Sequence, residues 1–330
     1  MQSEPTHFVG RLLRRREAGV LALVVLTVLV VGWYRPDSLA GDNVRNMLER
    51  CAPGAIVACG LTLVIVTGEI DISVGSLMGL LAAVVGLCTS TQRMGLPVAT
   101  GVAITLAAGA GVGLVNGLLV TVGRVPSIIV TLGMLTALRG VTELAMGGKW
   151  IEALPADLRF LGTGSAAGVP ISVWTAGLVV AATAYLAYQT PLGRRIYAVG
   201  SSPRAARMAG LSERRIKVFV FALTGLLVAV ATLVSVTQLD KIEQGIGKGF
   251  ELFAVTAVVV GGTAISGGRG TIWGSILGVA LLVIVRPALV FLPVGQDTTY
   301  WERAIQGGLI LVAVLADHIA RRRSGRGEGA

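Results

Sequence analysis

Residues 218–239 of the chain read VFVFALTGLLVAVATLVSVTQL, twenty-two residues without a charged side chain. An α-helix needs about 20 mostly apolar residues to cross the hydrocarbon layer of a bilayer. The whole chain continues this pattern, since 54% of its 330 residues are hydrophobic and only 14% are charged. A soluble domain carries about 25% charged residues because its surface faces water. The composition therefore predicts an all-α protein that crosses a membrane many times.

Charged residues interrupt the apolar runs and divide the chain into ten predicted spans. They are approximately residues 18–34, 51–68, 72–92, 95–122, 125–146, 168–190, 218–239, 252–267, 271–291 and 303–319. The last three are interrupted by Arg269, Arg286, Pro287 and Pro293. The 45 glycines favour a helical bundle, because small residues let membrane helices approach closely. We expect this transmembrane domain to occupy residues 18–319.

Lysine and arginine gather in three clusters, at residues 11–16, 194–217 and 321–326. Such clusters beside apolar spans are typical of cytoplasmic segments. Six spans between the first two clusters and four between the last two place all three on the same side. We therefore expect a cytoplasmic N-terminal segment at 1–17, a cytoplasmic loop at 193–217 and a cytoplasmic tail at 320–330. This distribution of the net charge of +10 argues against nucleic-acid binding, which needs one continuous basic face.

The segment TGEIDISVGS at residues 67–76 places two carboxylates, Glu69 and Asp71, between apolar runs. A charged side chain inside a bilayer is costly, so one that is kept there indicates a functional site. On this interpretation Glu69, Asp71 and Ser73 line a translocation pathway. The alternative is a short cytoplasmic turn in which both acids are solvated and Ser73 caps the next helix.

The basic loop contains the signals of a short helix at residues 202–210. Ser202 is suited to the N-cap, Pro203 to the first helical position, and Gly210 to the left-handed conformation that ends a helix. Its other residues of interest are Ala205, Ala206, Arg207 and Ala209. Two turns of helix between two spans would protrude from the cytoplasmic face and offer a docking surface to a partner subunit. The alternative is an ordinary positively charged loop.

Residues 261–274 read GGTAISGGRGTIWG. A phosphate-binding loop needs a lysine followed by a hydroxyl residue, and that pair occurs nowhere in the chain. A tight bend between two spans fits the run better, because only glycine permits such close approach of backbones. The glycines that we expect at the bend are Gly261, Gly262, Gly267 and Gly268.

Three further glycine patterns, at positions 75/79, 109/113/117 and 274/278, predict faces on which helices pack closely. The sequence shows neither a Ser/His/Asp arrangement nor a cluster of metal ligands. Its three cysteines lie in or beside apolar runs. We therefore expect a transporter subunit rather than an enzyme, with no cofactor bound by the chain itself.

Four segments in combination resemble the permeases of carbohydrate-importing ABC systems, in the ribose-type branch. They are GEIDISVGS at 68–76, VPSIIVTLGMLTALRG at 125–140, the loop at 193–211 and the glycine-rich run at 261–274. The resemblance covers about residues 45–320, and GGKWIE at 147–152 looks most like the rhamnose and autoinducer-2 members. Glu69 departs from the family pattern, which more often has glycine at that position.

The resemblance implies a permease subunit that conducts a sugar or sugar-like solute, such as rhamnose, autoinducer-2 or another pentose or hexose. It implies ABC ATPase subunits that bind ATP and Mg²⁺, a periplasmic solute-binding protein, and a second permease that is either another copy or a homologue. The loop at 201–211 matches the family's ATPase-contacting segment, and the expected location is the bacterial inner membrane, surrounded by lipid. A secondary transporter is the alternative, which titratable residues in mid-span would favour.

Overall fold

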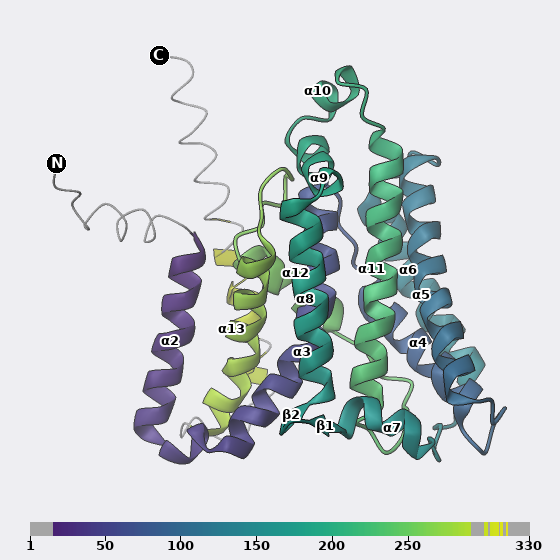
Figure 1. Cartoon of the computed structure of the whole chain (residues 1–330), viewed down its shortest axis with the longest axis vertical. Helices are drawn as coiled ribbons and strands as arrows, with labels where there is room; N and C mark the ends of the chain where they lie inside the picture. The colour runs from purple at the N-terminus through teal and green to yellow at the C-terminus, as the bar shows by residue number, and fades with distance from the viewer. Residues whose placement is uncertain (1–15, 292–299, 303, 310, 313–314, 316–330) are drawn as a thin grey trace.

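The computed structural model describes residues 16–291, 300–302, 304–309, 311–312 and 315. Within these ranges the chain is almost entirely helical (Figure 1). Its elements are α2 (Arg16–Tyr34), η1 (Pro36–Leu39), α3 (Gly41–Val66), α4 (Val74–Thr89), α5 (Val98–Thr121), α6 (Ser127–Met146), α7 (Ala156–Thr163), β1 (Ser165–Ala166), β2 (Val169–Pro170), α8 (Ile171–Gln189), α9 (Pro191–Ser201), α10 (Pro203–Met208), α11 (Glu213–Val236), α12 (Phe250–Val260) and α13 (Ile272–Phe291).

Seven of these helices are long and apolar enough to cross a membrane, namely α2, α3, α5, α6, α8, α11 and α13. The prediction of an all-α, multi-pass membrane protein is therefore confirmed. The predicted spans at 72–92 and 252–267 correspond to shorter helices, α4 and α12, of 16 and 11 residues. The tenth predicted span, 303–319, includes residues outside the described ranges, so the number of ten spans stays a prediction.

Two helices begin well before the apolar runs that predicted their spans. α3 begins at Gly41, well before residue 51, and Arg45 pairs with Glu49 one turn later, Nε to Oε1 at 3.2 Å. α11 begins at Glu213 rather than at 218, with Ser212 as its cap. In both cases charged residues end the apolar run but not the helix, because helical charged residues pair with neighbours one turn away.

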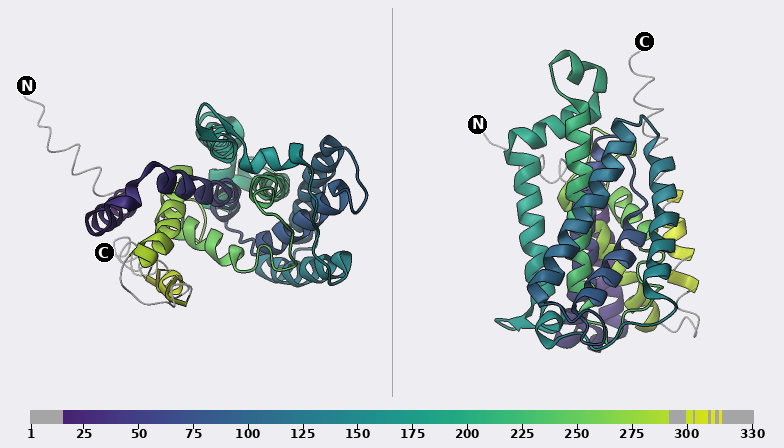
Figure 2. Two further views of the ribbon diagram at one scale, coloured as in Figure 1. Left: turned by 90° about the horizontal axis from the view of Figure 1, so that it is seen from below. Right: turned by 90° about the vertical axis from the view of Figure 1, so that its right-hand side faces the viewer.

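The long helices run side by side, and the two ends of the bundle differ (Figures 1 and 2). α9 and α10 lie at one end, where α10 projects beyond the long helices. α7 and the antiparallel hairpin of β1 and β2 lie at the other end. α2 stands at the edge beside α13, and its first residues lie at the same end as α9 and α10. The predicted topology places this end in the cytoplasm.

Glycines bring the central helices into backbone contact. A Cβ on Gly225 of α11 would overlap the carbonyl oxygen of Gly109 in α5, and one on Gly113 would overlap that of Phe221. Such close approach stabilises helix pairs in membranes through dispersion contacts. Gly274 and Gly278 approach α12 in the same way, and Gly75 and Gly79 approach the loop at residues 246–251. All three predicted glycine faces are therefore confirmed as packing faces.

The second half of α3 forms the centre of the bundle, because every residue from Ala52 to Val66 is buried. The outer helices instead expose large apolar side chains, among them Leu144 of α6 and Leu178 of α8, which are 83% and 72% exposed. A soluble protein rarely exposes so much apolar surface. These faces are suited to contact with lipid.

Candidate functional site

α3 and α4 are joined by a non-helical linker, residues 67–73, which contains the predicted acidic motif. Asp71 and Ser73 are buried in it, at 3% and 0% exposure. Oδ1 of Asp71 accepts hydrogen bonds from the Ser73 amide at 2.9 Å and from its hydroxyl at 2.6 Å. Ser73 Oγ in turn accepts from Nδ2 of Asn116 in α5 at 3.0 Å. Asp71 is therefore fixed in the interior rather than solvated.

The amides of Thr67, Gly68 and Glu69 still donate to carbonyls of α3, whereas side chains hold the second half of this linker. Ser73 stands at the N-cap position of α4 as predicted, but its Oγ does not cap the helix, since it accepts from Asn116 Nδ2 instead of from an amide of α4. The Ile70 amide donates to Ser127 Oγ at 3.2 Å, and the Thr131 hydroxyl donates to the Ile70 carbonyl at 3.4 Å. α4 is about 24 Å long at 1.5 Å per residue. It is thus shorter than the roughly 30 Å hydrocarbon layer. α4 alone is therefore too short to cross that layer.

Glu69 points toward α11, where it belongs to a continuous set of ion pairs. Lys217 Nζ lies 2.6 Å from Glu69 Oε1 and 2.8 Å from Glu213 Oε1. Oε2 of Glu213 lies 2.8 Å from Nη1 of Arg207 in α10. We call Glu69, Lys217, Glu213 and Arg207 the ion-pair chain. Its two positive and two negative charges balance, which lowers the cost of shielding them from water.

The acidic motif, the basic loop and the glycine-rich bend meet at one backbone junction. The Gly268 amide donates to the Val66 carbonyl oxygen at 2.8 Å. A Cβ on Gly200 of α9 would overlap that same oxygen, and one on Gly268 would lie 2.7 Å from the backbone of Ser201. The ends of α3 and α9 and the bend before α13 are therefore in direct contact.

α9 is a helix that the sequence did not reveal. Thr190 caps it by accepting a hydrogen bond from the Gly193 amide at 3.1 Å. Tyr197 donates its hydroxyl to the carbonyl of Gly270 at 2.8 Å. The ordinary pKa of a tyrosine already keeps this hydroxyl protonated at neutral pH. Burial raises the pKa of Tyr197 further. α9 is thus anchored on the glycine-rich bend.

The predicted short helix is present as α10. Ser202 is its N-cap and accepts from the Ala205 amide at 3.3 Å, and Pro203 lies in its first turn. Gly210 has the left-handed conformation, with φ +77°. These features confirm the helix. Its role as a docking surface stays a prediction.

The surface of α10 differs from the predicted one at two positions. Ala206 is 4% exposed and belongs to the hydrophobic core of the bundle, so it packs α10 against the rest of the chain. Met208, which the sequence reading did not single out, is 84% exposed at the tip. Arg204 and Ala205 are exposed beside it. An exposed methionine is typical of surfaces that bind a partner, because its flexible thioether adapts to irregular gaps.

The glycine-rich bend occupies residues 261–271, between α12 and α13. Gly262, Gly267 and Gly268 have positive φ values of 99°, 84° and 74°, which other residues adopt only with strain. A Cβ on Gly261 would overlap the carbonyl oxygen of Gly274. This bend and the linker are thus two non-helical segments that lie side by side, since a Cβ on Gly267 would lie 2.9 Å from the amide nitrogen of Gly68.

Sequence reasoning missed two polar contributors to this region. Asn116 is fully buried, and its Oδ1 has no hydrogen-bond partner in the part of the chain that the structure describes. An isolated amide in an apolar run is a signal that could have identified it. Lys217 was grouped with the other cytoplasmic cations, although its spacing of four residues from Glu213 already suggests an ion pair on one helix face.

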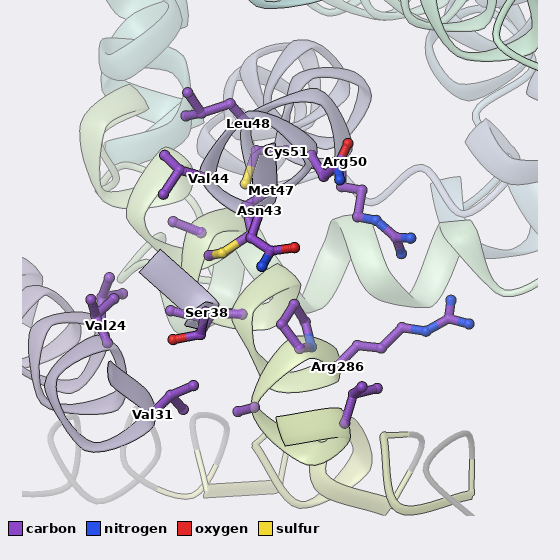
Figure 3. A pocket seen from close by; sticks show the side chains of 17 residues that line it. Val24, Val31, Ser38, Asn43, Val44, Met47, Leu48, Arg50, Cys51 and Arg286 are labelled. Atoms are coloured by element: carbon purple, nitrogen blue, oxygen red, sulfur yellow. The ribbon is translucent and has the colours of Figure 1, made fainter. Parts of the chain in front are cut away.

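A cavity of about 450 Å³ lies elsewhere, between α2, α3 and α13 (Figure 3). Its walls are mostly apolar, and Arg50 and Arg286 lie at one edge. It contains none of the predicted site residues. Ser38 and Asn43, which line it, belong to the end of the bundle that carries the β-hairpin. The cavity is therefore separate from the linker and the ion-pair chain.

Comparisons with known proteins extend over nearly the whole chain. A family model described as "Branched-chain amino acid transport system / permease component" matches residues 43–314. The ribose import permease protein RbsC of Haemophilus influenzae is 35% identical over 323 residues, which cover 96% of this chain and 98% of that protein. The protein of the same name from Escherichia coli K12 is 38% identical over 306 residues, or 92% and 93% of the two chains.

A third relative is named for the import of a different solute. The autoinducer 2 import system permease protein LsrC of Yersinia enterocolitica is 39% identical over 260 residues, which cover 79% of this chain and 70% of that protein. No solved structure matches the chain.

Proposed function

The chain belongs to the family of permease components of branched-chain amino acid transport systems, and we propose that it conducts a sugar or sugar-like solute. Family membership makes it a permease subunit of an ATP-binding-cassette importer rather than an enzyme. With its seven long apolar helices, it is a multi-pass protein of the bacterial inner membrane.

The proposed solute class rests on the relatives rather than on the family description. The description names branched-chain amino acids, whereas the relatives that align over most of this chain import ribose or autoinducer 2. A sugar carries many hydroxyl groups, so its pathway should offer hydrogen-bonding side chains. Ser73, Asn116 and Asp71 are the polar groups that the linker region gathers in an apolar bundle. We propose that these residues meet the solute when the linker opens.

The proposed partners follow from the same family. ABC ATPase subunits would hold ATP and Mg²⁺, a periplasmic binding protein would deliver the solute, and a second permease, identical or homologous, would complete the pathway. The chain itself lacks the lysine and hydroxyl pair of a phosphate-binding loop. Purified chain alone should therefore neither hydrolyse ATP nor accumulate solute.

The observation that carries the proposal is the position of α10. This helix projects past the long helices, exposes Met208 and Arg204, and joins the ion-pair chain through Arg207. A helix of six residues is too short to be stable alone in water, so packing must hold it. A projecting helix that is tied to the interior is suited to receive movement from an ATPase.

Reconstitution into proteoliposomes tests the proposal. The chain would be combined with candidate ATPase and binding-protein subunits from the same organism, and uptake of ribose, rhamnose, autoinducer 2 and leucine would be compared with and without ATP. We expect ATP-dependent uptake of one of the first three and none of leucine. Uptake by the chain alone, driven by an ion gradient, would instead identify a secondary transporter. Uptake of leucine alone would show that the solute is a branched-chain amino acid, as the family description says.

A further inference from the structure

The ion-pair chain leads from the most exposed helix of the structure to its buried linker. Arg207 belongs to α10, Glu213 and Lys217 lie one turn apart on α11, and Glu69 belongs to the linker. Side-chain exposure falls from 59% at Arg207 to 12% at Lys217 and 15% at Glu69. A movement of α10 therefore acts on a charged group in the interior.

The two ion pairs of Lys217 differ from those on the surface, whereas the Arg207–Glu213 pair, whose arginine side chain is 59% exposed, resembles them. Charges that are partly shielded from water attract each other more strongly, and salt screens them less. If one partner is removed, the other remains charged and half-buried, which costs more than the loss of an exposed pair. Lys217 is held by two carboxylates, one on its own helix and one on the linker. Glu69 is therefore bound to move with the start of α11.

The linker is the segment whose conformation can change when Glu69 moves. The amides of Ile70 and Ser73 donate to side chains rather than to helical carbonyls, and such segments rearrange at a lower free-energy cost than helices. Asp71 lies two residues after Glu69 and holds Ser73, which in turn holds Asn116. A shift of Glu69 thus reaches Asp71 and the first turn of α4.

We infer that the ion-pair chain couples α10 to the linker, so that displacement of α10 by an ATPase moves Glu69 and repositions Asp71. The inference rests on the proposed function for the identity of the motor, but the coupling itself belongs to this chain. Glu69, Lys217, Glu213 and Arg207 are positioning residues in this scheme, because they act on the pathway through the linker.

The first test needs only the full chain in lipid nanodiscs and measures amide hydrogen exchange at residues 67–73. Arg207→Gln removes a charge at a position that is 59% exposed, so the variant should fold. We expect exchange in the linker to become at least about fivefold faster, the lower end of typical coupling between sites. Arg204→Gln is the matched control, since it removes the same charge from the same helix without breaking an ion pair between described residues. Unchanged exchange in Arg207→Gln would overturn the inference.

The second test uses the reconstituted importer and measures solute transported per ATP hydrolysed. Glu69→Gln and Arg207→Gln should each lower this ratio about fivefold or more. The double variant should be no worse than the stronger single variant, because one broken link interrupts the whole chain. Lys217→Arg, which keeps the charge, should retain transport. Fully additive losses would contradict the coupling. If the wild type moves no solute with its ATPase, the proposed function fails, while the exchange measurement still decides the inference.

Discussion

The amide of Gly268 donates to the carbonyl oxygen of Val66 at 2.8 Å and joins the glycine-rich bend to the last residue of α3. Gly200 of α9 approaches the same oxygen so closely that a Cβ there would overlap it. The linker with its acidic motif begins at the next residue. Three segments therefore meet at a single carbonyl group directly beside the candidate site.

Gly200→Ala should destabilise the protein, because overpacking a closely packed site costs about 1–3 kcal/mol. The measurement is the midpoint of thermal unfolding of the purified protein in detergent. Gly177→Ala is the matched control, since Gly177 lies in α8 with nothing within 4 Å of an added Cβ. Equal midpoints for the two variants would show that the junction tolerates a side chain.

The crossing of α5 and α11 permits a stricter comparison within one helix. Gly113 faces the backbone of α11, whereas Gly111 of the same helix has open space around it. Gly113→Ala should lower the unfolding midpoint through overpacking. Gly111→Ala should leave it unchanged or raise it, because alanine favours a helix by about 1 kcal/mol over glycine. The reverse order would refute the assignment of this packing face.

The glycine spacing predicted these packing faces but not their partners. Spacing shows which side of a helix can approach another backbone, and it carries no information about which helix arrives there. Hydropathy likewise located the spans but overestimated α4 and α12. The predicted spans run on through residues 72–73, 90–92 and 261–267, which carry no charge and yet lie outside the two helices. The resemblance to ribose-type permeases is confirmed by relatives that align over almost the full length.

The ion-pair chain could not be predicted from the sequence, for a different reason. Glu69 and Lys217 are 148 residues apart, and neither residue alone distinguishes a solvated charge from a paired one. The alternative of a solvated turn was therefore reasonable, and only the fold shows that α11 brings a cation to this acid. Ser73 illustrates the same limit, because a serine before a helix predicts a cap unless another donor, here the Asn116 amide from α5, occupies its oxygen.

Ser73→Ala should impair transport more than it impairs folding. The change deprives Asp71 of one donor and Asn116 of its acceptor, and each buried polar group that is left unpaired costs about 1–3 kcal/mol. We expect the loss to weaken the transporting conformation, and about 1.4 kcal/mol there lowers solute uptake about tenfold. Uptake by proteoliposomes is the measurement.

Ser76→Ala controls for the loss of a buried hydroxyl in the same region. Ser76 is also fully buried, but its hydroxyl donates only to the Ser73 carbonyl at 2.9 Å. Uptake in this variant should stay near that of the wild type. Equal losses in both variants would indicate general disruption of α4 rather than a role of the Asp71 contacts.

Met208→Asp should separate the chain from its ATPase without unfolding it. Met208 is 84% exposed on α10, so a carboxylate there is well solvated in the free chain but unfavourable in an apolar contact. The measurement is co-purification of the ATPase with the tagged chain. Met94→Asp is the control, because Met94 is also an exposed methionine, at 68%, and lies in the loop between α4 and α5. Normal co-purification of the Met208→Asp variant would place the docking surface elsewhere.

α10 can contact a cytoplasmic ATPase only if its end of the bundle faces the cytoplasm. Cysteine labelling measures this orientation. Arg204 on α10 and Ala156 at the start of α7 are both exposed and lie at opposite ends of the bundle. Positively charged loops are retained in the cytoplasm. We therefore expect the basic segment around Arg204 to lie there. In a background without the three native cysteines, a membrane-impermeant maleimide should label Ala156→Cys in intact spheroplasts. It should label Arg204→Cys only after the membrane is permeabilised. Labelling of Arg204→Cys from outside would place α10 away from any cytoplasmic ATPase, and the docking surface and the proposed motor would fail together.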